Sequence, residues 1–244
     1  MFKADYFRPT TLVHYKESNA FKKFECLVDE HHNGIVPSKL KLEQLIDHCK
    51  NLYDPGLDML EDFQREEVFD YFYIERLGFT VVTKEFVAKM SELLSDRKVL
   101  EVGAGRGTFA HAMRQHAQSY RAIEDRSLTY GFFDWWKDAS PVFGNVEHVS
   151  FNANMLRDVD DIVICWPDGD VGYEIVRAME PGQRLIVLGD SARSGDFTGT
   201  ELFWDAVIGY RFTEDEKLGR ELNESYTHLP ERSNCVEWSV FVRK

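Results

Sequence analysis

The sequence predicts an α/β fold: a seven-stranded, mostly parallel sheet with helices on both faces, preceded by a helical N-terminal region. Two observations carry this prediction. From residue 98 onward, short apolar runs alternate with amphipathic stretches, the pattern of a parallel sheet and its covering helices. Before residue 96, apolar residues recur mostly at helical spacing. We therefore expect a helical region over 1–95 and a sheet-containing domain over 96–244.

Seven apolar runs are the expected strands. The fourth and fifth are continuous runs of branched residues, as in strands buried on both faces. The last alternates apolar and polar residues, which favours an antiparallel strand with one face closer to water. The runs span 98–102, 120–124, 146–150, 161–166, 184–189, 206–212 and 236–244, and the sixth is the weakest.

In the N-terminal region, 40–53 and 84–94 carry apolar residues at helical spacing. Between them, 58–79 mixes acidic with aromatic residues, and two interpretations are open: a lid over a binding site, or packing against the sheet. We favour packing, because aromatic side chains at helical spacing usually belong to a core.

The composition indicates a globular protein. The 244 residues are 43% hydrophobic and 14% aromatic, and no apolar stretch approaches the roughly 18 to 20 residues that cross a bilayer. The N-terminal sequence lacks the apolar segment and cleavage site of a secretory signal, so we expect a cytoplasmic protein without a membrane partner. A net charge of −13 argues against a nucleic-acid partner, since such binding is driven by Lys and Arg.

The cysteines and histidines show no metal-binding spacing. His31 and His32 are adjacent, but no carboxylate or cysteine stands at a recognised ligand distance from them, so we assign no metal. The cysteines form no C-x-x-C pair, and we interpret them as reduced core residues. They are Cys26, Cys49, Cys165 and Cys235.

The most informative motif is the glycine-rich stretch E-V-G-A-G-R-G, which spans 101–107 between an apolar strand and an amphipathic helix. A dinucleotide fold requires its third glycine three residues after the second, where the helix N-terminus meets a pyrophosphate. Here Thr108 holds that position, and the glycine comes one residue early, at Gly107. A carboxylate at Glu101 would repel a diphosphate and suits a ligand that bears a cation.

This stretch, an acid followed by any residue and then G-x-G-x-G, resembles motif I of the class I, Rossmann-like S-adenosylmethionine-dependent methyltransferases. S-adenosylmethionine carries a sulfonium and an ammonium group and no phosphate, in agreement with the charge argument. The resemblance implies a Rossmann-like fold and S-adenosyl-L-methionine as cofactor. The residues implied to bind it here are Glu101, Gly103, Ala104, Gly105, Gly107 and, at the end of the fourth strand, Cys165.

Further cofactor contacts are expected where the second and third strands end. Glu124 and Asp125 follow the second strand, about 23 residues after Glu101, compared with roughly 20 for the acid that binds a ribose hydroxyl pair. We favour Glu124, with Asp125 as its substitute; two solvated acids are the alternative. After the third strand, Asn152 stands where this enzyme class often contacts the adenine amino group, although a turn asparagine fits equally well.

Several later segments resemble an uncharacterised methyltransferase-like family, from about Val99 to Lys244. In that family a C-W-P-P loop follows strand four, and an I-G-E, T-G-D, F-F pattern follows strand five. Corresponding segments here include C-W-P-D-G-D, L-I-V-L-G-D and F-T-G-T-E-L-F-W. The chain departs from the pattern with Asp168 for the second proline, Asp190 for the glutamate and Thr200 for the aspartate. These changes leave the acceptor open.

The loop after strand four, 165–170, is where a methyl acceptor should approach, because ligands of open parallel sheets lie outside the carboxyl ends of the strands. Trp166 offers a flat face and Pro167 fixes the backbone, so we expect both to contact the substrate. Asp168 and Asp190 are the candidate catalytic residues, as general bases, if the acceptor must lose a proton early.

Three other residues near this end have weaker claims. His228 and Tyr226 are more distant candidates for a base. Asp170 either adds charge to the loop or caps the following helix.

We therefore expect a methyltransferase whose acceptor is a small molecule or a protein. Two alternatives are a non-catalytic binding or scaffold protein of the same fold, and a nucleic-acid methyltransferase. The W-P-D-G segment lacks the acid or amide, P-P and aromatic residue of amino-methylating nucleic-acid enzymes. The aromatic stretch 127–143 could stack on bases, but without a basic cluster beside it we favour packing on the sheet. The oligomeric state is left open.

Overall fold

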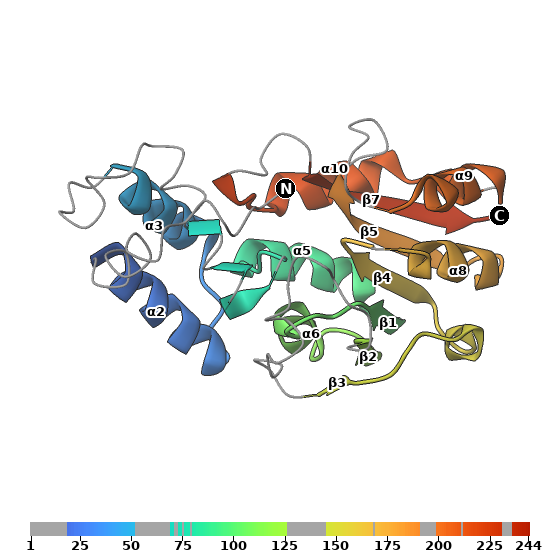
Figure 1. Cartoon of the computed structure of the whole chain (residues 1–244), viewed down its shortest axis with the longest axis horizontal. Helices are drawn as coiled ribbons and strands as arrows, with labels where there is room; N and C mark the ends of the chain where they lie inside the picture. Colours follow the sequence, from blue (N-terminus) through green and yellow to red (C-terminus); the bar gives the residue numbers. More distant parts are fainter. Residues whose placement is uncertain are drawn as a thin grey trace.

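The computed structural model describes residues 19–51, 69–70, 73–74, 76–78, 80–125, 145–167, 169–190, 199–210, 212–230 and 236–244. Seven strands form one sheet in the order β3-β2-β1-β4-β5-β7-β6 (Figure 1). All neighbouring strands are parallel except β7, which is antiparallel to both β5 and β6. This confirms the predicted fold class. The strands are β1 (Lys98–Val102), β2 (Ser119–Ile123), β3 (Val146–Glu147), β4 (Asp161–Cys165), β5 (Arg184–Asp190), β6 (Phe212–Glu214) and β7 (Val236–Arg243).

Helices cover both faces of the sheet (Figure 1). One face packs against α5 (Lys84–Leu94), α6 (Thr108–Met113) and α10 (Glu216–Ser225), and the other against α8 (Val171–Ala178) and α9 (Glu201–Gly209). The remaining helices of the described chain are α2 (Asn19–His32), α3 (Lys39–Asn51) and the short 3-10 helix η2 (Ala153–Leu156).

Strand alternation divides the apolar core into these two layers. In β1, Val99 belongs to the layer under α5, α6 and α10, whereas Leu100 and Val102 belong to the layer under α8 and α9. Because successive side chains of a strand point to opposite faces, Glu101 lies on the same face as Val99. The side chain of Glu101, the acid of the glycine motif, therefore lies on the face of the sheet that α5 and α6 cover.

The N-terminal helices share a core with the sheet. Phe24 of α2 packs against Phe69 and Tyr73, with ring centroids 5.9 and 6.4 Å away. These rings belong to the same apolar cluster as Val99 of β1. Packing is thus observed for the two described aromatic residues of 58–79, most of which lies outside the described residues. The division at 95/96 stays a prediction.

The predicted strand at 206–212 is wrong. Residues 206–209 complete α9, and β6 begins only at Phe212. The Oγ1 of Thr200 accepts a hydrogen bond from the Phe203 amide, 3.3 Å away, and so caps the helix. Buried Phe203, Ala206 and Val207 then follow helical spacing. The apolar run that suggested a strand is the buried side of this helix.

Two smaller expectations also fail. The third strand is shorter than predicted, since β3 ends at Glu147. Cys26 is exposed rather than buried, because α2 turns Phe24, Leu27 and Val28 toward the core instead. Cys165 is partly buried, while Cys235 and the side chain of Cys49 lie outside what the structure describes.

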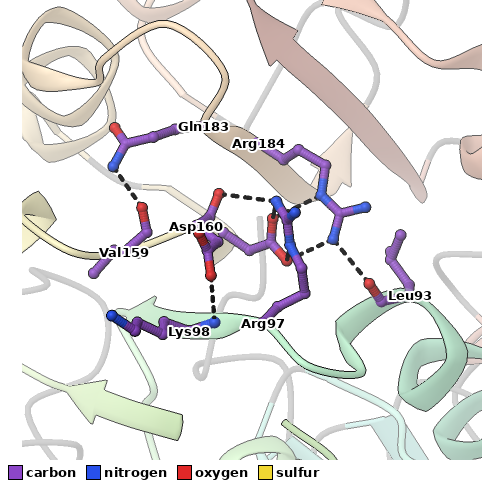
Figure 2. A network of polar contacts seen from close by, with 8 residues as sticks. Leu93, Arg97, Lys98, Val159, Asp160, Gln183 and Arg184 are labelled. Carbon is purple, nitrogen blue, oxygen red and sulfur yellow. Dashed lines mark hydrogen bonds and ion pairs between the residues drawn. The ribbon is translucent and has the colours of Figure 1, made fainter. Parts of the chain in front are cut away.

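A polar network joins the central strands at their N-terminal ends (Figure 2). Asp161, the first residue of β4, is fully buried. Its carboxylate accepts two hydrogen bonds from Arg97, at 3.0 and 2.8 Å, and two from Arg184 of β5, at 2.6 and 2.5 Å. Arg184 also donates to the Leu93 carbonyl at the end of α5, 2.8 Å away. The network thus joins β1, β4, β5 and α5.

We predict that Asp161→Asn lowers the free energy of unfolding by about 3 kcal/mol or more, because two guanidinium groups lose a buried counter-charge. Urea unfolding measures the change. The matched control is Glu147→Gln, which removes half of an exposed ion pair with Arg121 and should cost less than about 1 kcal/mol. Equal losses in the two variants would contradict the role given to Asp161.

Candidate ligand-binding site

The sheet has a switch point between β1 and β4. The chain leaves β1 toward β2 and β3 on one side, and later strands fill the other side from β4 onward. In open α/β sheets, ligands bind outside the carboxyl ends of the strands at such a point. The order also matches the 3-2-1-4-5-6 arrangement of dinucleotide-binding folds, with the antiparallel β7 inserted between β5 and β6. The glycine loop follows β1 at this position.

The glycine loop folds back onto the end of β2. Gly103, Gly105 and Gly107 have positive φ angles of 75°, 55° and 77°, which explains why these positions favour glycine. The amides of Gly103 and Ala104 both donate to the Ile123 carbonyl, each at 3.0 Å. Two of the loop's backbone donors are therefore already satisfied within the protein.

Glu124 occupies the inside of this loop. Its Oε2 accepts a hydrogen bond from the Gly105 amide, 2.6 Å away, and the residue is only 3% exposed. Phosphate-binding loops turn such amides toward a ligand anion. Here a carboxylate of the protein takes that place, so a diphosphate would have to displace it.

Glu101 lies beneath the loop and is buried, at 2% exposure. The Tyr120 hydroxyl donates to its Oε2, 2.9 Å away. Burial raises the pKa of Glu101 to about 8, because the charged form loses water; the Tyr120 hydrogen bond opposes this rise, nearby Glu124 adds to it, and Arg114 opposes it. The sequence argument treated Glu101 as a negative charge, but burial at this position favours the neutral carboxyl group.

Cys165 ends β4 on the same face of the sheet as Glu101, since Glu101 pairs with Val163 two residues earlier. Burial, and then the charge of Glu101, raise the pKa of its thiol, while a side-chain hydrogen bond with Thr80 opposes them. The thiol is therefore not a nucleophile at neutral pH. Thr80 precedes α5, so the N-terminal region reaches the end of β4.

The loop after β4 is held by backbone contacts. The Trp166 amide donates to the Leu188 carbonyl at 2.7 Å, and the Pro167 carbonyl accepts from the Gly199 amide at 2.8 Å. Trp166 has a positive φ of 56°, a strained conformation that is rare for a bulky residue. Pro167 is buried and Trp166 is partly exposed.

The remaining predicted site residues have these positions. Asp168 lies outside the described residues. Asp190 ends β5, and its side chain is not described. Asp170 is the N-cap residue of α8 but makes no capping hydrogen bond through its side chain. Asp125 is partly buried directly after Glu124, and Asn152 is exposed at the N-cap of η2.

Tyr226 has a structural role. It is buried, its hydroxyl accepts from the Val81 amide at 3.0 Å, and its carbonyl accepts from Lys39 Nζ at 3.2 Å. It thus links the end of α10 to two parts of the N-terminal region. His228 packs edge-on against its ring, and burial, followed by the charge of Lys39, lowers the pKa of His228.

Two residues beside the site were not predicted from the sequence: Tyr120 and Thr80. The sequence offers a signal for Tyr120, which is the hydroxyl-bearing residue on the buried face of β2 that it shares with Ala122; its contact with Glu101 depends on the register of β1 and β2. Thr80 carries no such signal, because its place depends on how a loop before α5 crosses the sheet edge.

Comparison with known proteins finds similarity only among solved structures. No protein-family model and no curated protein sequence matches the chain. A precorrin-6y C5,15-methyltransferase from Geobacter metallireducens GS-15 is 14% identical, covers 65% of this chain and 86% of its own, and has a TM-score of 0.39. A TehB-like SAM-dependent methyltransferase from Corynebacterium glutamicum is 14% identical over 74% and 99% of the two chains, also with a TM-score of 0.39.

A ribosomal protein L11 methylase from Lactobacillus delbrueckii subsp. bulgaricus is similar to the same extent, with 14% identity over 66% of this chain and 76% of its own and a TM-score of 0.39. Similarities this distant carry no functional argument, so the function is argued from the site.

A membrane-spanning helix is not found in the part of the chain that the structure describes. Within the same residues, no group of three or more His, Cys, Asp or Glu side chains could hold a metal ion.

The buried acid generates a pH prediction. Folding raises the pKa of Glu101 from 4.5 to about 8, so the native state keeps a proton that the unfolded chain releases. The resulting stability is fully present below pH 4.5 and is lost as pH rises through about 8. Between pH 5 and pH 9, the wild type should therefore lose about 4 kcal/mol of unfolding free energy relative to Glu101→Gln, about 1.4 kcal/mol for each of the roughly three pH units below the folded pKa.

Urea unfolding at the two pH values measures this difference. Glu92→Gln is the control: its side chain is 71% exposed, so this variant should follow the wild type at both pH values. A constant difference between wild type and Glu101→Gln would contradict the burial of an ionisable group at this position.

Proposed function

We propose that the protein is a cytoplasmic S-adenosylmethionine-dependent methyltransferase that acts on a small molecule or a protein. The observation that supports this best is the pair of buried carboxyl groups at the glycine loop. Glu124 fills the place that a phosphate would need, and buried Glu101 nearby makes no ion pair among the described residues, although the charge of Arg114 acts on it. Such a site suits a nucleoside that bears a positive charge and no phosphate.

The residues fit S-adenosylmethionine group by group. Glu101 would face its cationic part. Glu124, with Asp125 beside it, would accept from the two ribose hydroxyls; a carboxylate has about four acceptor positions, so Glu124 can keep its bond to Gly105. Asn152 is proposed for the adenine amino group, and Cys165 for the wall of the pocket at the end of β4.

When bound, the cofactor supplies a methyl group that its sulfonium makes electrophilic. The contribution of the chain is to orient the acceptor, and orientation alone can supply about 7 kcal/mol of a barrier. Trp166 and Pro167 are proposed to contact the acceptor, because their loop is fixed to Leu188 and Gly199 at the carboxyl end of β4. Asp168 and Asp190 are the proposed bases, for acceptors that lose a proton early.

We also propose that the chain is a divergent relative of the C-W-P-P family, because its later segments resemble that family's pattern. The N-terminal region, 1–95, would cover the site, since Thr80 reaches Cys165. The net charge of −13 continues to disfavour a nucleic-acid acceptor.

Binding tests the proposal directly. Isothermal titration of S-adenosylmethionine and S-adenosylhomocysteine into the wild type should show saturable binding, and Glu124→Ala should weaken it at least about tenfold, because charge-assisted hydrogen bonds to the ribose are lost. Glu124→Gln is included because its amide oxygen can still accept from Gly105 and so preserve the loop. The control is Glu147→Ala, on the neighbouring strand, which should bind normally.

Three results would count against the proposal or narrow it. Equal or tighter binding of NAD or ATP at this loop would contradict it. Absence of binding by the folded wild type would favour a scaffold protein. Binding without transfer in a labelled-methyl screen of cell extract would favour a non-catalytic binding protein over an enzyme.

A further inference from the structure

Tyr120 is buried beside Glu101, where its hydroxyl can influence the ionisation of the Glu101 carboxyl group. Tyr120 lies on β2 opposite Val99 of β1. Because Glu101 is two residues after Val99, Tyr120 and Glu101 are diagonal neighbours on the same face of the sheet. Its hydroxyl donates to Glu101 Oε2 at 2.9 Å. Its ring packs edge-on against Phe109 of α6, with centroids 6.4 Å apart, so a change of the ring itself would disturb this packing.

The groups around Glu101 leave it without a counter-ion. Tyr120 faces it from β2, Glu124 from the loop after β2, Arg114 from the end of α6, and Cys165 from the end of β4. Arg114 donates instead to the Asn145 carbonyl, 2.8 Å away. Among the described residues, Glu101 makes no ion pair. A buried carboxylate in such surroundings needs a cation to ionise at low cost.

We propose that Tyr120 is a positioning residue for Glu101, and that the site takes up a cationic ligand in exchange for the Glu101 proton. The carboxylic acid O–H bond breaks, its electrons stay on the carboxylate, and the proton leaves to solvent as the cation enters. The Tyr120 hydroxyl remains bound to Oε2 throughout and stabilises the ionised form. This inference rests on the proposed function for the kind of ligand.

The direct consequence is that ligand affinity depends on pH. Release of one proton makes the dissociation constant fall about tenfold for each pH unit while Glu101 is protonated in the free protein. With a pKa of about 8 for Glu101, this holds from pH 5.5 to 7.5 and levels off above pH 8. At pH 7 close to one proton should be released for each ligand bound.

The experiment is isothermal titration of S-adenosylmethionine at fixed pH in two buffers that differ in ionisation enthalpy, repeated from pH 5.5 to 8.5. Glu101→Gln should bind more weakly, release no proton in the lower half of this range and lose the pH dependence there. The same variant also corrects for titration of the ligand's own amino group, whose pKa is about 8.

Two further variants separate positioning from packing. Tyr120→Phe keeps the ring but removes the hydroxyl that favours the charged form, so its pH profile should move upward, with affinity at pH 7 reduced several-fold. Tyr173→Phe, on α8 at the opposite face of the sheet, is the matched control and should keep the wild-type profile. Far-UV circular dichroism checks that each variant is folded.

An independent measurement uses infrared difference spectra. Addition of ligand to the wild type should remove a protonated-carboxyl band, and this change should be missing in Glu101→Gln. Binding that releases no Glu101-dependent proton would overturn the inference and leave the proposed function intact. Absence of binding at every pH would overturn both. An unshifted profile in folded Tyr120→Phe would overturn the role of Tyr120.

Discussion

Asp161 lies at the start of β4 with its carboxylate buried between two guanidinium groups, one ahead of β1 and the other in β5. This contact sets the three central strands at one level, with Glu101 beside Val163 and Cys165 beside Leu188. Because strand side chains alternate between faces, a slip of one residue would turn Glu101 to the opposite layer. The position of Glu101 and Cys165 near the C-terminal ends of the strands therefore depends on an ionic contact at the N-terminal ends.

The two buried glutamates of the site, Glu124 and Glu101, differ in the hydrogen bonds that stabilise their carboxyl groups. Glu124 receives a backbone amide hydrogen bond from Gly105, 2.6 Å away, which satisfies one of its carboxylate oxygens. Glu101 accepts a hydrogen bond from the Tyr120 hydroxyl and makes no ion pair among the described residues, and its burial raises its pKa to about 8. In the function proposed above, the position of Glu124 would accept hydrogen bonds from hydroxyl groups, and the position of Glu101 would become charged only when a cation offsets the charge. The two neighbouring acids would then recognise different parts of the proposed ligand.

The sequence predicts the sheet well because its signals are local. Glycines at 103, 105 and 107 require positive φ angles, and the continuous apolar runs of β4 and β5 reflect burial on both faces. It fails at Ala206 to Gly209, where four residues are too short to distinguish a strand from a helix and the Thr200 cap decides. It also misses Tyr120, whose meeting with Glu101 depends on the register of two strands. The ionisation of Glu101 depends on burial, which no local pattern reports.

The segment before α5 connects the N-terminal helices to the site through groups that the sequence does not single out. The Leu77 carbonyl accepts from the Thr108 hydroxyl at the start of α6, the Val81 amide donates to Tyr226, and Thr80 bonds with Cys165. Three residues of this segment thus contact the start of α6, the end of α10 and the end of β4. Two of these contacts use backbone atoms, so they do not depend on which side chains the segment carries at Leu77 and Val81. The Thr80 contact, by contrast, requires a hydroxyl side chain.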